Sequence, residues 1–158
     1  LKQIMKKIMI LIASFSMLMA CKKDRPELQP PASKMVGIQD DWQLSKVIQF
    51  DEITQRELDV SSVYIGTDPM KVNFKVTPTD TVYSVVAGTS ANYLGKSGKW
   101  KFDDNEYPTK VIINYDGNDY NLPLLRTIRE GDPTLEIKYT KICRGRNVVS
   151  YKYIFTRI

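Results

Sequence analysis

The segment that decides the fold is Lys71-Val72-Asn73-Phe74-Lys75-Val76-Thr77, in which apolar and polar residues alternate. Successive side chains of a β-strand point to opposite faces, so Val72, Phe74 and Val76 share one face and the polar residues take the other. The same pattern recurs in Leu135-Glu136-Ile137-Lys138-Tyr139-Thr140. Both segments therefore predict strands with one buried face and one wet face.

Similar β-rich runs fill the chain from Trp42 onward, and residues that favour turns separate them. Asp116-Gly117-Asn118 supplies the positive φ values of a tight hairpin. Arg144-Gly145-Arg146-Asn147 is a second polar turn that contains glycine. The predicted strands cover residues 42–50, 58–65, 71–77, 81–87, 98–102, 110–115, 120–128, 135–143 and 148–156. Residues 51–58 allow at most a turn or two of helix.

Short strands joined by short connections predict an all-β protein with an antiparallel, up-and-down sheet. A meander of this length removes its exposed edges by closing into a barrel of about eight strands. A β-sandwich is the alternative that the pattern leaves open. A barrel with about eight strands is wide enough for its own side chains or for one small ligand. We assign residues 37–158 to this barrel domain.

The first twenty residues have the pattern of an export signal. Lysines at the start precede an apolar run over residues 8–19, which is shorter than the roughly 20 residues that a membrane span needs. The run ends in Leu18-Met19-Ala20-Cys21, which resembles the lipobox of bacterial lipoproteins. We therefore predict a signal peptide at residues 1–20 and lipid attachment at Cys21, with an uncleaved anchor helix as the alternative.

Residues 21–36 are rich in prolines and polar side chains, so they have little to bury and are predicted to form a flexible tether behind the lipidated cysteine. Each methylene of a lipid chain contributes about 0.8 kcal/mol when it is buried, so more than one chain on Cys21 would anchor the protein permanently. The membrane is thus an expected partner of the mature protein through its lipid.

Four segments of the chain carry a resemblance to a known group. They are Gly37-Ile38-Gln39-Asp40-Asp41-Trp42-Gln43-Leu44, Ser97-Gly98-Lys99-Trp100-Lys101-Phe102-Asp103-Asp104, Tyr107-Pro108-Thr109-Lys110 and Val149-Ser150-Tyr151-Lys152-Tyr153-Ile154-Phe155-Thr156. With them the chain resembles, over about residues 34–158, the lipocalin-like lipoproteins of Bacteroidota, small families whose domains mostly have no assigned function. It implies a lipocalin-like barrel and no particular activity.

Two further features are similar to those of such proteins. Lipocalins carry Gly-x-Trp at the first strand and a late arginine packed on the tryptophan; here Gly37 and Trp42 are five residues apart. We predict that the guanidinium of Arg157 covers the Trp42 ring in a structural cation–π pair. Lys22 with Asp24 resembles the signal that sends some Bacteroidota lipoproteins to the cell surface. We expect a lipid-anchored protein of the outer membrane, facing the periplasm or the cell surface.

The composition argues against several classes of function. The chain has 23 basic and 18 acidic residues, and removing the three lysines at positions 2, 6 and 7 leaves 20 basic residues and a net charge of +2. No basic stripe remains, so we expect no nucleic-acid partner. The chain has no histidine, the commonest metal ligand and general base. Cys143, without a partner thiol once Cys21 is acylated, is expected to be a small apolar strand residue.

We therefore predict no enzyme, no metal site and no cofactor. Paired carboxylates could still support a glycosidase, but each pair sits beside a predicted turn, where acids are usually solvated. These pairs are Asp40-Asp41, Asp51-Glu52 and Asp103-Asp104.

Nine tyrosines, five phenylalanines and two tryptophans suggest a binding surface for a small apolar or amphipathic ligand. Such residues also fill cores and form cross-strand pairs, which is the commoner role of any one of them. The candidates for ligand contact are Trp100, Phe102, Tyr139, Tyr151 and Tyr153. The alternative function is protein interaction, in which a filled barrel docks to another envelope protein. An interior filled by side chains would favour docking, and an open apolar cavity would favour a ligand.

Overall fold

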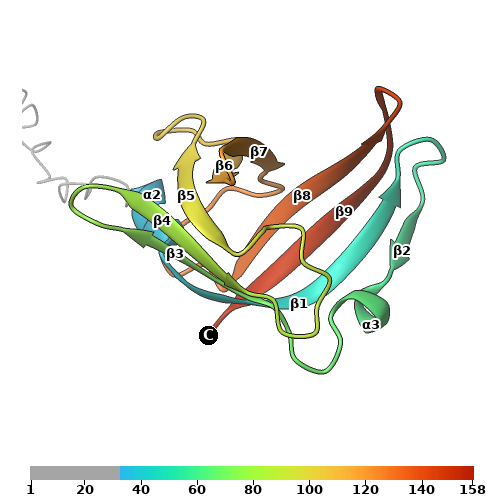
Figure 1. The fold of residues 1–158 in the computed structure, drawn as a ribbon, viewed down its shortest axis with the longest axis horizontal. Helices are drawn as coiled ribbons and strands as arrows, with labels where there is room; N and C mark the ends of the chain where they lie inside the picture. Colours follow the sequence, from blue (N-terminus) through green and yellow to red (C-terminus); the bar gives the residue numbers. More distant parts are fainter. Residues whose placement is uncertain (1–32) are drawn as a thin grey trace, which may run out of the picture. The chain divides into compact units, whose positions relative to one another are not determined.

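Nine strands and two short helices make up residues 33–158, the part of the chain that a computed structural model describes (Figure 1). In chain order they are α2 (Lys34–Ile38), β1 (Asp40–Asp51), β2 (Glu57–Asp59), α3 (Ser61–Tyr64), β3 (Lys71–Val76), β4 (Thr81–Val86), β5 (Ser97–Phe102), β6 (Lys110–Tyr115), β7 (Asn118–Pro123), β8 (Thr134–Cys143) and β9 (Arg146–Arg157). The predicted signal peptide, Cys21 and residues 21–32 of the predicted tether lie outside the described residues.

The strands form one antiparallel sheet in the order β7-β6-β5-β4-β3-β1-β9-β8, with β2 paired to β1 off this path. The two ends of the order meet where Leu124, directly after β7, forms a bridge with Ile137 of β8. The N–H of Leu125 also donates to the carbonyl of Glu136 at 3.0 Å. The sheet is therefore a nearly closed barrel, which confirms the predicted all-β, up-and-down fold over the sandwich.

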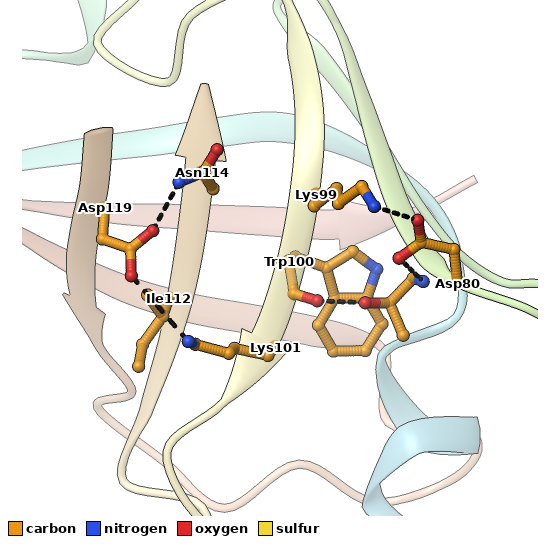
Figure 2. A pocket seen from close by; sticks show the side chains of 8 residues that line it. Asp80, Lys99, Trp100, Lys101, Ile112, Asn114 and Asp119 are labelled. Carbon is orange, nitrogen blue, oxygen red and sulfur yellow. Dashed lines mark hydrogen bonds and ion pairs between the residues drawn. The ribbon is translucent and has the colours of Figure 1, made fainter. Parts of the chain in front are cut away.

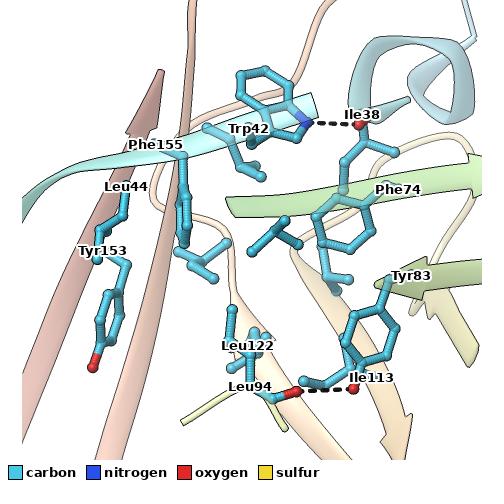
Figure 3. Close-up of a cluster of buried hydrophobic side chains, with 14 of the residues drawn as sticks. Ile38, Trp42, Leu44, Phe74, Tyr83, Leu94, Ile113, Leu122, Tyr153 and Phe155 are labelled. Atoms are coloured by element: carbon cyan, nitrogen blue, oxygen red, sulfur yellow. Dashed lines mark hydrogen bonds between the residues drawn. The ribbon is translucent and has the colours of Figure 1, made fainter. Parts of the chain in front are cut away.

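The alternating residues of the predicted strands do face the core. Val72 and Phe74 on β3 and Leu135 and Ile137 on β8 are all buried, with at most 3% of their surface exposed. A fully buried side chain of this size contributes about 1.5–3 kcal/mol through the hydrophobic effect. The remaining buried apolar residues include Ile38, Trp42, Leu44, Tyr83, Leu94, Ile113, Leu122, Tyr153 and Phe155 (Figure 3). The interior is thus filled by the barrel's own side chains.

Both predicted tight turns are present. Asp116 and Gly117 have φ values of 51° and 76° and join β6 to β7, while Arg144 and Gly145 have φ values of 50° and 75° and join β8 to β9. Positive φ at two central residues gives a turn whose twist matches that of the flanking strands. The turn residues therefore set the register of these two hairpins.

The predicted strand over residues 58–65 is wrong for most of its length. Only β2 is extended there, and α3 follows it. The carboxylate of Asp59 accepts hydrogen bonds from the N–H of Ser61 at 3.0 Å and from its hydroxyl at 2.6 Å. These bonds favour a turn over continued pairing, because a side chain that satisfies nearby backbone competes with the ladder.

Two other segments also differ from expectation. The possible helix over residues 51–58 is a turn, in which the Asp51 carboxylate accepts from the N–H groups of Ile53 and Thr54 at 2.8 and 2.9 Å. The strand predicted over residues 120–128 begins at Asn118 and ends at Pro123, because proline has no N–H to continue a ladder.

Helix α2 was not predicted, and its first three residues belong to the segment that the sequence assigns to the tether. The Ser33 side chain caps it by accepting from the N–H of Met35 at 3.2 Å. Neither helix within residues 33–158 is long and apolar enough to cross a membrane.

Arg157 joins the first and last described elements of the chain. Its guanidinium carbon lies 4.6 Å from the centre of the Trp42 ring, the cation–π arrangement that the sequence predicts. Its Nε and Nη2 groups donate to the carbonyls of Asp132 and Gly37, each at 3.0 Å, and Nη1 pairs with the Asp40 carboxylate. One side chain therefore holds together α2, β1, β9 and the loop before β8.

Arg157→Lys should lower stability, because an ammonium group cannot stack flat on Trp42 and also donate in these three directions. We expect a loss of about 1–3 kcal/mol, measured as a lower melting temperature by circular dichroism. Arg146→Lys, at the exposed end of the β8–β9 hairpin, is the control and should change stability by less than about 0.5 kcal/mol. Equal melting temperatures for both variants would show that the Arg157 contacts add no net stability.

Candidate functional site

Two of the three longest strands carry tyrosines near one end of the barrel. β1, β8 and β9 have 12, 10 and 12 residues, whereas β3 to β7 have 6 each, so the long strands project past their neighbours (Figure 1). Tyr139 on β8 pairs directly with Tyr151 on β9, and Ile137 pairs with Tyr153. These tyrosines continue the inward face of the two strands and pack against the buried core.

Two tyrosines from outside the long strands complete a cluster. Tyr93 lies in the loop of residues 87–96 between β4 and β5, and Tyr64 is the last residue of α3. The Tyr93 ring is nearly parallel to those of Tyr139 and Tyr151, at centroid distances of 5.2 and 6.2 Å and angles of 19° and 13°. The Tyr64 and Tyr151 hydroxyls are 3.0 Å apart. We call Tyr64, Tyr93, Tyr139, Tyr151 and Tyr153 the tyrosine cluster.

The loop that carries Tyr93 is anchored on both sides of this residue. The buried Ser90 hydroxyl accepts from the N–H of Met70 at 2.9 Å and donates to the carbonyl of Ile65 at 2.7 Å. On the other side Leu94 is buried, and its carbonyl accepts from the Tyr83 hydroxyl at 2.9 Å. Tyr93 itself remains 36% exposed, so a well-held backbone presents a partly exposed ring.

The Tyr153 hydroxyl is buried without a hydrogen-bond partner among residues 33–158. The side chain is only 1% exposed, and burial raises its pKa, with a smaller effect from the neighbouring tyrosines. Tyr83 is equally buried, but its hydroxyl bonds to Leu94 (Figure 3). A buried polar group left unpaired costs about 1–3 kcal/mol and is rare in folded proteins. Among the described residues, the Tyr153 hydroxyl is therefore a buried polar group whose hydrogen-bonding capacity is unused.

Two more hydroxyls of the tyrosine cluster have raised pKa values. Burial raises the pKa of Tyr93, and the hydrogen bond with Tyr151 is the largest cause that raises the pKa of Tyr64. The positive charge of Lys141 opposes both shifts, more weakly than these causes. The cluster presents ring faces and hydroxyl groups, and none of its five side chains is a carboxylate or an amine.

The candidate residues predicted from sequence fall into two places. Tyr139, Tyr151 and Tyr153 lie together in the tyrosine cluster. Trp100 and Phe102 lie apart from it in the packed core, where their rings meet edge to face at 5.3 Å and the Trp100 Nε1 donates to the carbonyl of Lys75 at 3.2 Å. Tyr64 and Tyr93 were not predicted, because a short helix and an irregular loop show no alternation that would reveal which way a side chain points.

A pocket of about 530 Å³ adjoins the cluster where β7 and β8 separate. Beyond the Leu124–Ile137 bridge neither strand pairs with the other, and we call the gap between residues 118–123 and 138–143 the seam. The residues around the pocket come from both sides of the seam: Asp119, Tyr120, Asn121, Pro123, Tyr139, Thr140, Ile142 and Asn147. Because Tyr139 belongs to both, the seam leads to the tyrosine cluster.

A second groove of about 290 Å³ lies over β5 and β6 on the outer face of the barrel (Figure 2). Its charged side chains pair with one another. Lys99 contacts Asp80, and Lys101 is 3.8 Å from Asp119, which also accepts from the Asn114 amide at 2.6 Å. With these groups already paired, the groove offers a ligand less than the tyrosine cluster does.

The paired carboxylates considered from the sequence do not converge on one site. Asp40 pairs with Arg157, and Glu52 pairs with Lys138 at 2.6 Å, which lowers the Glu52 pKa. The Asp103 carboxylate accepts from the Thr109 hydroxyl, the main cause that lowers its pKa to about 2. A general acid needs a raised pKa, so these contacts give no support to a glycosidase site.

Two further sequence expectations concern cysteine and metals. Cys143 is the last residue of β8, as expected for a strand residue, and its side chain is exposed. Among residues 33–158 no three acidic or cysteine side chains gather as metal ligands.

Comparison with known proteins places the chain in a family. Residues 19–156 match the family described as a domain of unknown function, DUF5004. Neither the curated proteins nor the solved structures contain a match to this chain. The family match spans nearly the whole chain, from just before Cys21 to the end of β9. The chain therefore belongs to the DUF5004 family, and its described residues form a nearly closed antiparallel β-barrel.

Proposed function

We propose that this protein is a lipid-anchored envelope protein whose barrel binds a small amphipathic ligand at the tyrosine cluster without catalysing a reaction. The observation that carries this proposal is the Tyr153 hydroxyl, which is buried among aromatic rings and has no hydrogen-bond partner within residues 33–158. Ring faces favour an apolar body, and one buried hydroxyl favours a single polar group on it.

The filled interior limits where the ligand can bind. Side chains from all parts of the sheet occupy the centre of the barrel, so a ligand has to bind at the end where the long strands project. There the cluster and the adjoining pocket of about 530 Å³ lie within the size range of small-molecule sites. The proposed ligand is therefore held at one end of the barrel and not in a deep internal cavity.

The location rests on the first residues of the chain. The apolar run that ends in Leu18-Met19-Ala20-Cys21 and the resemblance to lipocalin-like lipoproteins of Bacteroidota support a lipidated Cys21 and an outer-membrane location. Either the periplasmic or the outer face of that membrane is compatible with the proposal.

Docking to another envelope protein is the second candidate function, and the seam favours it. Beyond the Leu124–Ile137 bridge, β7 and β8 each have one edge that pairs with no other strand of the described part of the chain. An extended segment of a partner can add to such an edge as a further strand. The filled barrel interior also favours this alternative.

Removing the Tyr153 hydroxyl should stabilise the ligand-free protein. We expect Tyr153→Phe to raise the unfolding free energy by about 1 kcal/mol, because it deletes an unpaired buried polar group. Tyr83→Phe is the matched control and should lower the unfolding free energy by about 1 kcal/mol, because it leaves the Leu94 carbonyl without its donor. Urea unfolding after removal of bound molecules measures both. A loss of stability in Tyr153→Phe would mean that its hydroxyl is already satisfied.

The proposed ligand should co-purify with the protein. We expect native mass spectrometry of the full chain, released from lipid nanodiscs, to show a bound small molecule in the wild type and in Tyr107→Phe, an exposed tyrosine outside the cluster. Tyr153→Phe should lose most of this molecule, because its polar group has lost its partner. Equal occupancy in all three proteins would rule out Tyr153 as the binding group.

Lipid attachment can be tested at the two cysteines of the chain. Cys21→Ala should abolish labelling by radioactive palmitate. The substitution removes the thiol that is acylated and prevents the cleavage that would expose the amine of residue 21 for a further acyl chain. Cys143→Ala should keep the full label, since Cys143 lies at the exposed end of β8. Labelling that persists in Cys21→Ala would contradict the assignment.

A further inference from the structure

Tyr93 lies where a flat ligand would stack. Tyr139 and Tyr151 are cross-strand partners on the inward face of β8 and β9, and we call these two rings, both of which lie against Tyr93, the platform. The Tyr93 ring lies against both at 5.2 and 6.2 Å, within 19° of parallel. These distances and angles are those of stacked aromatic rings.

The Tyr93 ring can move away without unfolding its loop. Ser90 and Leu94 hold the loop backbone on either side through bonds to Met70, Ile65 and Tyr83. The Tyr93 side chain is 36% exposed, which makes it the most exposed ring of the cluster. Rotation of one side chain therefore suffices to uncover the platform.

A ring in the position of Tyr93 would lie beside the Tyr153 ring. The centroids of the Tyr93 and Tyr153 rings are 6.4 Å apart, with 56° between the ring planes. The ligand therefore needs a hydroxyl or carbonyl substituent directed at the buried Tyr153 hydroxyl, which has no partner among the described residues. The seam pocket, which Tyr139 also lines, gives the ring a route from solvent.

We propose that Tyr93 is an internal occupant of a binding site for an uncharged aromatic compound that carries a hydroxyl or carbonyl group. The compound displaces the Tyr93 ring, stacks on Tyr139 and Tyr151, and bonds through its substituent to Tyr153. The inference rests on the proposed function and deepens it by naming the ligand class. In this proposal the loop of residues 87–96 competes with the ligand, because its Tyr93 ring occupies the ligand position when no ligand is bound.

Two probes separate aromatic stacking from general apolar binding. 2-Naphthol has a flat ring system with one hydroxyl, and decahydro-2-naphthol has the same carbon skeleton and hydroxyl without a flat ring. Isothermal titration calorimetry of each probe is carried out on the full chain in lipid nanodiscs, and the heat of empty nanodiscs is subtracted. The proteins are the wild type, Tyr93→Ala, Tyr93→Phe, Tyr139→Leu and Tyr107→Ala.

Tyr93→Ala should bind 2-naphthol about tenfold more tightly than the wild type, because the competing ring is gone. Tyr93→Phe keeps that ring and should show no such gain, while Tyr107→Ala, outside the cluster, should match the wild type. Tyr139→Leu should bind about tenfold more weakly. Decahydro-2-naphthol should gain little from Tyr93→Ala, because a puckered ring stacks poorly.

Several outcomes would overturn the inference. If Tyr93→Ala binds 2-naphthol no more tightly than the wild type, then Tyr93 does not compete for the platform. An equal gain for both probes would remove the aromatic ligand class. Should Tyr93→Ala fail to fold by circular dichroism, an unchanged affinity in Tyr139→Leu would still refute the platform. A co-purified aliphatic molecule that depends on Tyr153 would leave the proposed function standing while this inference fails.

Discussion

The contact between Arg157 and Trp42 is the constraint on which the rest of the barrel depends. It joins the first strand to the last, and Arg157 also contacts α2 and the loop before β8. The backbones of β1 and β9 are also paired there, with Trp42 directly opposite Arg157. The Trp42 indole is fixed in turn by its bond to the Ile38 carbonyl at 2.9 Å. The polar groups of Arg157 and Trp42 are therefore paired at this end of the barrel.

The other end differs in its balance of polar groups. At that end the long strands project, and the rings of the tyrosine cluster pack against the core. The Tyr64 and Tyr151 hydroxyls bond to each other, while that of Tyr153 finds no partner among the described residues. The two ends of the barrel therefore differ in how completely their buried polar groups are paired, and the proposed ligand site lies at the end with the unpaired group.

Local sequence rules predict the sheet well because strands and tight turns depend on neighbouring residues. Alternation in Lys71–Val76 predicts β3, and the polar turns that contain Gly117 and Gly145 predict both hairpins. Both glycines do have a positive φ in the structure. The rules fail where side chains bond to nearby backbone, as Asp59 does with Ser61 at the start of α3.

The site was only half predictable for a related reason. Alternation places Tyr139, Tyr151 and Tyr153 on one face of β8 and β9, and cross-strand pairing then brings them together. Tyr93 reaches the same place through a loop whose path depends on distant bonds to Ser90 and Leu94, and no local pattern encodes such bonds. Trp100 was a candidate because it is aromatic, like the cluster residues, but its side chain lies in the packed core.

The seam also makes the barrel unequal in its resistance to opening. β1 has neighbours on both sides over much of its length, whereas β7 is held mainly by β6 and by the single bridge at Leu124. Fluctuations that peel β7 outward break few bonds, while those that free β1 dismantle the whole sheet. Amide protons along β7 should thus exchange with solvent long before those of β1 and β9. Local stability should therefore be highest in the central strands β1 and β9 and lowest along the edge that β7 forms.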